Sequence, residues 1–194
     1  ALVKDKRQPN LALLPAAQNR SKESITPAQM TELVAKLSAA GYHFVLIDCP
    51  AGIEGGFRNA IAAAKEAVIV TTPEISAVRD ADRVIGLLEA NDIKAKRLII
   101  NRLKPAMVQE DMKMSVKDVQ DILAVPLLGV VPDDERVIVS TNKGEPLVLE
   151  KKLSLAGVAF SNIARRFLGE KVPFLDLAAP HDDLFSRFRR MFRG

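Results

Sequence analysis

Short apolar runs alternate with amphipathic stretches along most of the chain. The apolar runs are the length of strands and lie at residues 11–14, 44–47, 67–70, 97–100 and 127–131. Between and after them, apolar residues recur at helical spacing, which predicts helices near residues 26–41, 76–89, 116–123 and 153–168. Strands that alternate with helices in this way predict an α/β fold, with a mostly parallel sheet and helices on both faces.

The residues just after the predicted strands are the first place to look for a site. In an open parallel sheet, ligands bind beyond the carboxyl ends of the strands. Asp48 follows directly after the run Phe44-Val45-Leu46-Ile47, where its carboxylate could hold a metal-bound water beside a phosphate, as in a Walker B strand. The pattern alone leaves a second interpretation open, in which Asp48 only caps a loop.

Composition narrows the class of protein. A chain of 194 residues can build one sizeable core, so a single domain is expected. One cysteine and two histidines exclude an intrachain disulfide and a cysteine-rich zinc site, and favour a reducing compartment. No apolar run approaches the roughly 18 residues that a spanning helix needs. The net charge of +4 is uneven, because the last eleven residues contain four arginines and no acidic residue.

The last eleven residues have the pattern of an amphipathic helix. At about 100° per residue, the apolar side chains fall within an arc of about 120°, and the arginines take the other side. This favours a helix lying in the plane of an anionic membrane, although a helix docked on its own domain is the alternative. The apolar residues are Leu184, Phe185, Phe188, Met191 and Phe192, and the basic ones are Arg187, Arg189, Arg190 and Arg193.

The wording of several segments is more specific than their periodicity. These segments are DCPAGIEGG at 48–56, TTPEISAVRDADRVIGLLE at 71–89, LIINR at 98–102, VVPDDERVIVSTNKGEPLV at 130–148 and LFSRFRRMFRG at 184–194. Together they resemble the MinD/ParA family of deviant-Walker P-loop ATPases, in particular the cyanobacterial and plastid branch of the division-site-selection ATPases. The resemblance runs essentially from end to end of the chain.

The resemblance implies roles for residues at the nucleotide. Asp48 matches the Walker B aspartate that orients Mg²⁺ through water, and Gly52 lies in the turn that faces the γ-phosphate, so these two are the catalytic candidates. Asn101 matches the residue that reads the adenine edge, for which its amide has both a donor and an acceptor. The other candidates for cofactor binding are Arg102, Pro132 and Asp133 around the base and Glu54 and Glu74 at the nucleotide-sandwiched dimer interface.

The resemblance also implies partners. Asp80 and Asp82 match the acidic helix positions that couple nucleotide state to a MinC-like division inhibitor and a MinE-like activator. Without the resemblance, each of these acidic residues would be read as a solvated polar residue. The implied assembly is an ATP-bound homodimer that binds anionic membrane lipids and has no specific nucleic-acid partner. The implied location is peripheral, on the inner face of a membrane, from the cytoplasm or the plastid stroma.

A phosphate-binding loop of the form G-x-x-x-x-G-K-[ST] occurs nowhere in the sequence. In the family this loop precedes the segment with which the chain begins. We therefore expect residues 1–170 to be the carboxyl-terminal portion of a P-loop ATPase domain, 171–183 a linker and 184–194 the membrane-targeting helix. A chain without the loop is expected neither to bind ATP tightly nor to hydrolyse it, and to leave one flank of its sheet exposed.

The function that the resemblance implies is an ATPase that recruits a division inhibitor to the membrane. ATP would form the dimer, two tails together would hold the membrane, and hydrolysis would release both. Two alternatives remain. One is a ParA-like DNA-partitioning ATPase whose arginines bind nucleic acid, although three aligned phenylalanines have no use in phosphate binding. The other is a catalytically inactive interaction module.

Overall fold

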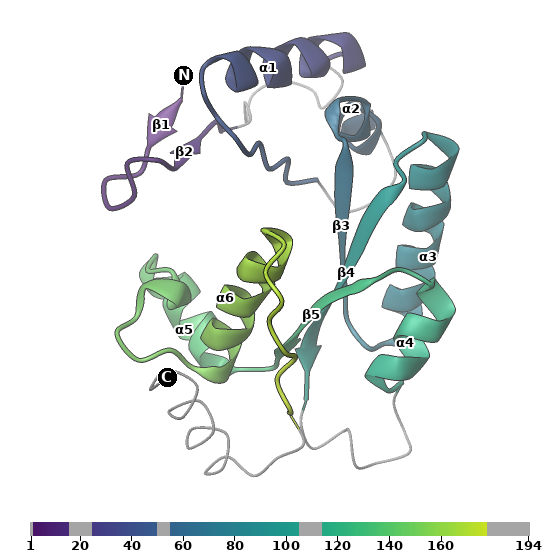
Figure 1. The fold of residues 1–194 in the computed structure, drawn as a ribbon, viewed down its shortest axis with the longest axis vertical. Coiled ribbons are helices and arrows are strands. Elements are labelled where there is room, and N and C mark those ends of the chain that lie inside the picture. The colour runs from purple at the N-terminus through teal and green to yellow at the C-terminus, as the bar shows by residue number, and fades with distance from the viewer. Residues whose placement is uncertain (1, 16–24, 50–54, 105–113, 178–194) are drawn as a thin grey trace. The chain divides into compact units, whose positions relative to one another are not determined.

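The computed structural model describes residues 2–15, 25–49, 55–104 and 114–177. The chain divides into two compact units, 1–64 and 65–194, and each is considered by itself. Figure 1 shows the elements of both units along the chain. Gly52, Glu54 and all the candidate membrane residues from Leu184 to Arg193 lie outside the described residues.

The first unit contains two helices that pack on each other. Helix α1, Pro27–Ala39, begins at Thr26, whose side chain forms a capping box with Gln29. Its predicted apolar face is its least exposed face. Helix α2, Gly55–Ala63, was not predicted. The two helices are linked by a hydrogen bond of 3.3 Å from Thr31 Oγ1 to the carbonyl oxygen of Ala62.

The two strands predicted in the first unit, at 11–14 and 44–47, are not members of a parallel sheet, so these two predictions are wrong. The run 11–14 provides only β2, Ala12–Leu13, which pairs antiparallel with β1, Val3–Lys4. The run 44–47 forms no strand, and Phe44 and Leu46 are 59% and 84% exposed. An apolar run is stable as a strand only when a neighbouring strand takes up its backbone hydrogen bonds, and no described strand pairs with residues 44–47.

The second unit contains the predicted parallel sheet. Strands β3, Glu66–Thr71, β4, Ala95–Leu103, and β5, Leu127–Pro132, are parallel and lie side by side in that order. Helix α3, Ile75–Ala90, connects β3 to β4, and α4, Val116–Leu123, connects β4 to β5. The fold class is therefore confirmed as α/β.

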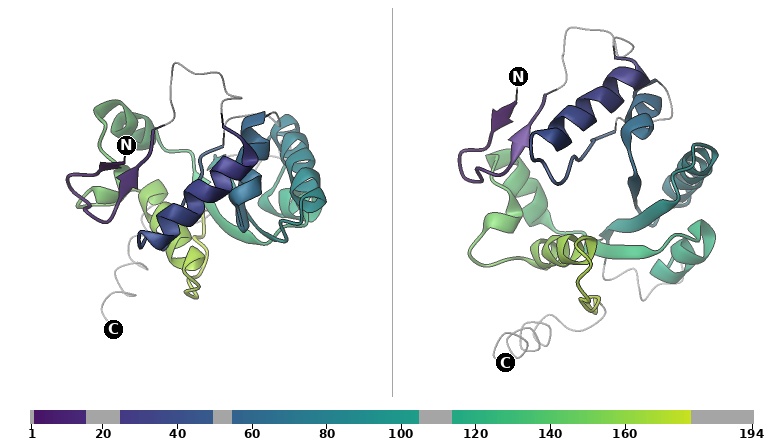
Figure 2. Two further views of the ribbon diagram at one scale, coloured as in Figure 1. Left: turned by 90° about the horizontal axis from the view of Figure 1, so that it is seen from above. Right: turned by 45° about the horizontal axis from the view of Figure 1, so that its top comes forward.

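Helices cover the two faces of this sheet, as Figure 2 shows. Leu98 and Ile100 of β4 are fully buried on the side of α3, where Val78 and Ile85 are also buried. On the other face, α6, Leu155–Phe167, packs against β5, with Leu128, Val131, Ala159 and Ile163 in one apolar cluster. Between β5 and α6 lie α5, Glu135–Lys143, and a short 3₁₀ helix, Leu147–Leu149.

Two valines of β3 are exposed among the described residues of the second unit. Val68 and Val70 of β3 are 40% and 58% exposed, whereas Ile69 between them is buried. Val70 is in register with Ile99 of β4, which packs under the cluster around α6, so the exposed valines are on that same face. Among the described strands, β3 is an edge strand.

Candidate functional site

The carboxyl end of β4 is irregular where the candidate base-reading residues lie. The pairing of β4 with β5 shifts between Ile100 and Leu103, which leaves Asn101 and Arg102 in a bulge. The backbone of Arg102 has φ 57°, which lies in the left-handed region that residues other than glycine rarely adopt. In this conformation its backbone N–H donates to Oδ1 of Asn101 at 3.0 Å. The bulge therefore fixes the amide of Asn101 at the end of the strand.

The end of β5 lies beside this bulge. Pro132 is buried and pairs with Leu103, and the N–H of Asp133 donates to the carbonyl oxygen of Leu103 at 2.9 Å. The carboxylate of Asp133 forms an ion pair with the guanidinium of Arg102, with 3.8 Å between Oδ1 and Nε. Four candidate residues, Asn101, Arg102, Pro132 and Asp133, are thus brought together from two strands that are thirty residues apart in the sequence.

Asp134 was missed by the sequence analysis, although it holds this loop in place. Its Oδ1 accepts from the N–H of Arg136 at 2.9 Å, which caps the first turn of α5. Burial alone would raise the pKa of Asp134, but hydrogen bonds from Ser154 and from the N–H groups of Arg136 and Ala156 outweigh burial and lower it. One carboxylate therefore serves the beginnings of both α5 and α6. The sequence does contain a signal for the start of α5: an aspartate that directly precedes Glu135 and an apolar run.

The end of β3 lies at the same edge of the sheet. Thr71 is in register with Ile100, and the chain then passes through Thr72 and Pro73 into α3. Glu74 occupies the N-cap position of α3 without a side-chain hydrogen bond to the helix, and it is exposed. Its carboxylate is therefore placed at the edge of the sheet without being used to stabilise α3.

The two candidate regulator-binding residues lie on the surface of α3. Asp80 and Asp82 are both exposed, and Asp80 forms an ion pair of 3.6 Å with Arg83. Pairs this exposed contribute little to stability. Both carboxylates are therefore accessible to a partner protein.

Asp48 belongs to the first unit and is exposed at the end of the 44–49 segment. The next residue, Cys49, is also exposed, and its thiol pKa is raised by partial burial and by the charge of Asp48. A raised pKa keeps the thiol neutral and poorly nucleophilic.

The described ranges contain no helix both long and apolar enough to span a bilayer. They also contain no group of three or more His, Cys, Asp or Glu residues placed to hold a metal ion. A single carboxylate such as Asp48 would suit Mg²⁺ that is mainly coordinated by water and phosphate oxygens.

The amide of Asn101 keeps hydrogen-bonding capacity at the end of β4. Asn101 uses one lone pair of Oδ1 for the N–H of Arg102, which leaves the second lone pair as an acceptor and Nδ2 as a donor. That combination can pair with a base edge that offers one donor and one acceptor. The triphosphate has no comparable cradle in the sequence, because no glycine-rich loop with its lysine occurs in residues 1–194.

Known proteins are similar to this chain along its whole length. The ParA family model, described as NUBPL iron-transfer P-loop NTPase, matches residues 22–168. The septum site-determining protein MinD of Synechocystis sp. is 63% identical over 194 residues, which are 100% of this chain and 73% of that protein. A putative septum site-determining protein MinD of Guillardia theta is 62% identical over the whole chain, which covers 72% of it.

Solved structures show the same similarity. The MinD cell division protein of Aquifex aeolicus superposes with a TM-score of 0.82 at 43% identity, over 90% of this chain and 71% of that chain. The MinC:MinD cell division protein complex of Aquifex aeolicus gives 0.81 at 43% identity, over 89% and 69%. MinD of Pyrococcus horikoshii OT3, complexed with Mg-ADP, gives 0.63 at 31% identity, over 76% and 60%.

Proposed function

Because this chain belongs to the ParA family of P-loop NTPases and, within it, to the MinD septum site-determining proteins, we propose that it is an ATPase governing the placement of the division site. One observation of the structure supports the nucleotide part of this proposal most directly. The N–H of Asp133 donates to the carbonyl oxygen of Leu103, which joins the ends of β4 and β5, and the N–H of Arg102 donates to Oδ1 of Asn101 beside that junction.

The proposed nucleotide is ATP with Mg²⁺. Asn101 would pair with the adenine edge, Pro132 and Asp133 would flank the base, and Asp48 would hold a water of the Mg²⁺ shell. Bound Mg²⁺ would neutralise charge on the triphosphate. The proposal concerns the full-length protein, since the chain spans 73% of the Synechocystis relative and its 194 residues contain no phosphate-binding loop.

We further propose that ATP controls a homodimer and, through it, membrane binding. Glu54 and Glu74 would lie at the dimer interface, and the exposed carboxylate of Glu74 at the edge of the sheet supports that role. The segment 184–194 would bind anionic lipids with its phenylalanines and arginines. Each basic residue near the surface contributes only about 1 kcal/mol, so one short tail binds marginally and two tails bind far better.

The proposed protein partners are a MinC-like division inhibitor and a MinE-like activator. The similarity to the MinD chain of a MinC:MinD complex supports the first of these partners. The accessible carboxylates of Asp80 and Asp82 on α3 give each partner a possible contact. The proposed location is the inner face of a membrane, reached from the cytoplasm or the plastid stroma.

A DNA-partitioning ATPase is the less well supported function. Its nucleic-acid contacts would need basic residues, and apart from the tail the chain has as many acidic as basic residues. The relatives that match the whole chain at 63% and 62% identity are septum site-determining proteins. An inactive interaction module would describe the 194 residues only if no phosphate-binding loop accompanied them in the full-length protein.

The test is recruitment of the inhibitor to vesicles. Full-length protein, a MinC-like inhibitor from the same organism and anionic vesicles are sedimented with ATP or with ADP. We expect the inhibitor to sediment only with ATP, and Asp82→Ala to reduce its recovery several-fold. Asp121→Ala, which removes an exposed carboxylate from α4, is the matched control and should have no effect. Equal recovery with ATP and ADP would refute the proposed function.

A further inference from the structure

The chain does not leave the second unit at the end of α6. The helix ends at Phe167, and Gly169 adopts φ 90° and turns the chain. The segment that follows runs back toward β5, as Figure 1 shows in yellow. Leu175 then packs against the apolar cluster between β5 and α6. Residues 169–175, which we call the strap, are therefore attached to the body of the second unit.

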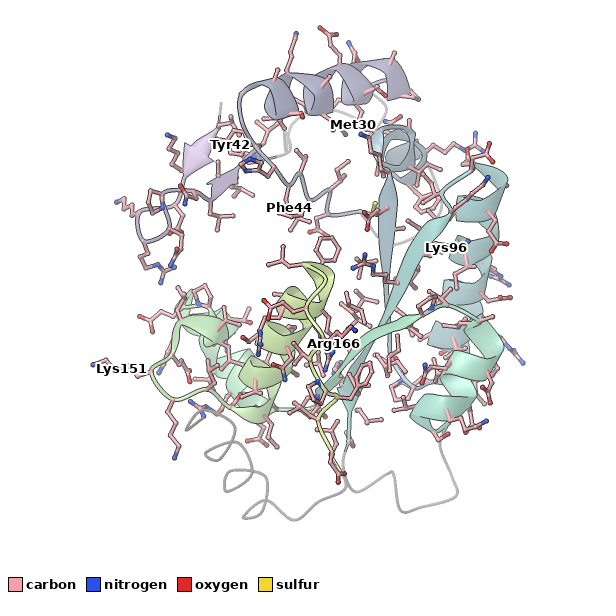
Figure 3. The ribbon with its side chains drawn as sticks, in the orientation of Figure 1. Met30, Tyr42, Phe44, Lys96, Lys151 and Arg166 are labelled. Atoms are coloured by element: carbon pink, nitrogen blue, oxygen red, sulfur yellow. The ribbon has the colours of Figure 1, made fainter. Side chains whose placement is uncertain are left out.

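One side chain holds two backbone carbonyl groups of the strap. The guanidinium of Arg166 donates to the carbonyl oxygen of Val172 at 2.8 Å through Nε and to that of Pro173 at 2.6 Å through Nη2. Its Nη1 donates to the carbonyl oxygen of Leu128 in β5 at 3.0 Å. A single arginine thus joins α6, β5 and the strap, and Figure 3 labels it there.

Packing completes the attachment. The ring of Phe174 lies over the Arg166 guanidinium, with 4.2 Å from Cζ to the ring centroid. Burial lowers the pKa of Arg166, but arginine remains charged at neutral pH, so the cation–π contact and the charge-assisted hydrogen bonds persist. A lysine at this position could not make three hydrogen bonds in these fixed directions.

The neighbouring arginine provides a contrast. Arg165 forms one ion pair with Glu170, at 2.8 Å, and both side chains are about half exposed. An exposed pair of this kind contributes little. Arg165 and Arg166 are adjacent and carry the same charge, but Arg166 hydrogen-bonds to β5 and to the strap, whereas Arg165 forms one exposed ion pair.

We propose that Arg166 is a positioning residue that fastens the strap to the body and so sets the length of linker between that body and the amphipathic segment 184–194. The role of that segment rests on the proposed function. With the strap attached, eight residues, 176–183, separate Leu175 from Leu184. With the strap released, the linker would comprise the fifteen residues 169–183.

Linker length matters because two tails bind one membrane together. The effective concentration of the second tail falls roughly as the −3/2 power of the linker length once the linker exceeds the required span. Lengthening from eight to fifteen residues would lower it about two- to threefold. Release of the strap should therefore weaken dimer-dependent membrane binding without changing the tail itself.

The first arm of the test measures attachment of the strap. Folded full-length protein is digested briefly with a lysine-specific protease, and cleavage after Lys171 is followed by mass spectrometry. Cleavage after the exposed Lys151 is the internal reference. We expect Arg166→Ala to speed cleavage after Lys171 at least tenfold and Arg166→Lys to have an intermediate effect. Arg165→Ala should stay near the wild-type rate.

The second arm measures the consequence. Co-sedimentation with vesicles of phosphatidylglycerol and phosphatidylcholine, in a 1:3 ratio, is compared in ATP for the same variants. Arg166→Ala should bind two- to threefold more weakly than Arg165→Ala. Insertion of seven Gly/Ser residues after Leu177 in the wild-type chain should reproduce the weaker binding without faster cleavage after Lys171.

Each outcome bears on the proposal. Unchanged cleavage after Lys171 in folded Arg166→Ala would refute the attachment. Faster cleavage with undiminished vesicle binding, in both Arg166→Ala and the insertion variant, would refute the positioning role while leaving the proposed membrane function intact. Wild-type protein that fails to bind vesicles in ATP would overturn both the positioning role and the proposed function, and the cleavage arm would still decide whether Arg166 holds the strap.

Discussion

Two adjacent residues at the end of β4, Asn101 and Arg102, have different roles in the candidate base site: Arg102 orients the amide of Asn101. Arg102 accepts a left-handed backbone conformation, which costs a residue with a side chain about 1–2 kcal/mol. The same conformation directs its N–H toward Oδ1 of Asn101. The exposed ion pair with Asp133 cannot offset that strain, since such pairs contribute less than about 1 kcal/mol. We infer that Arg102 orients Asn101 chiefly through its backbone.

Replacing Asn101 by Ala in the full-length protein should reduce the preference for ATP over GTP. The amide can match the donor and acceptor of adenine, and each lost hydrogen bond costs about 0.5–1.5 kcal/mol, so the loss of both should lower the preference at least about fivefold. Displacement of a fluorescent ATP analogue by ATP and by GTP measures the ratio. Asn142→Ala, an exposed amide on α5, should leave the ratio unchanged. The same ratio in both variants would remove the base-reading role.

Asp134 gives a prediction for stability against pH. Its pKa is lowered in the folded state, so its contribution is fully present above the unfolded-state value, near 4, and is lost as the pH falls through the folded-state value. Asp134→Ala should cost about 1–2 kcal/mol at pH 7. Urea unfolding from pH 7 to pH 3 should show this difference narrowing below about pH 4.

The control for Asp134 is an exposed aspartate. Asp121→Ala removes a carboxylate that pairs only with Lys117 on the surface of α4, and it should change stability by less than about 0.5 kcal/mol. A difference between Asp134→Ala and wild type that stayed constant down to pH 3 would contradict the capping of α5 and α6 by the ionised carboxylate.

The residues that gather at the ends of β4 and β5 can be predicted from the sequence, but the hydrogen bonds that join them cannot. Placing Asn101 and Asp133 at one edge required only the strand runs and the rule for parallel sheets. The bulge, the left-handed Arg102 and the double cap at Asp134 depend on pairing between distant segments, which no local pattern encodes. Arg166 was missed for the same reason, because its acceptors lie on β5 and on the strap.

Among the elements, β5 and α6 are closely packed at Gly129. A Cβ added at Gly129 would come within 2.2 Å of Cγ1 of Ile163, so the Ile163 side chain or the helix that carries it would have to shift. Gly129 therefore allows α6 to lie directly on the strand. The same contact brings the Arg166 guanidinium against β5.

Gly129→Ala should destabilise the protein by about 1–3 kcal/mol, because the added methyl group overpacks the contact between β5 and Ile163. Gly86→Ala is the matched control: a Cβ at Gly86 meets nothing within 4 Å, and in the middle of α3 alanine should stabilise by about 0.5–1 kcal/mol. Denaturant unfolding measures both variants. A neutral Gly129→Ala would contradict the close approach of α6 to β5.

Elements with clear periodicity were predicted well, and those that depend on partners were not. The limits of α4 were predicted to the residue. Its apolar residues recur at helical spacing, and Ser115 caps its first turn. Helix α5 was missed because Val137, Ile138 and Val139 form a β-branched run, although Asp134 before it and Gly144 after it are ordinary helix boundaries. The run 44–47 was wrong as a strand because pairing, not apolarity, makes a strand.

Under the proposed function, the body and the tail of the molecule have separate tasks. The second unit places the candidate base site at one edge of its sheet, and the strap attaches the start of the linker to β5 and α6. The sequence of the tail supplies apolar and basic groups whose individual contributions are small. Under the proposed function, nucleotide therefore acts on the membrane only by determining whether tails bind singly or in pairs.

The most direct test of this account is the nucleotide dependence of membrane binding by the full-length protein. Sedimentation with anionic vesicles should be at least tenfold greater in ATP than in ADP, and Phe188→Glu with Phe192→Glu should abolish it while leaving the fold intact by circular dichroism. Binding of equal strength in ATP and in ADP, or undiminished binding by the double variant, would contradict the account.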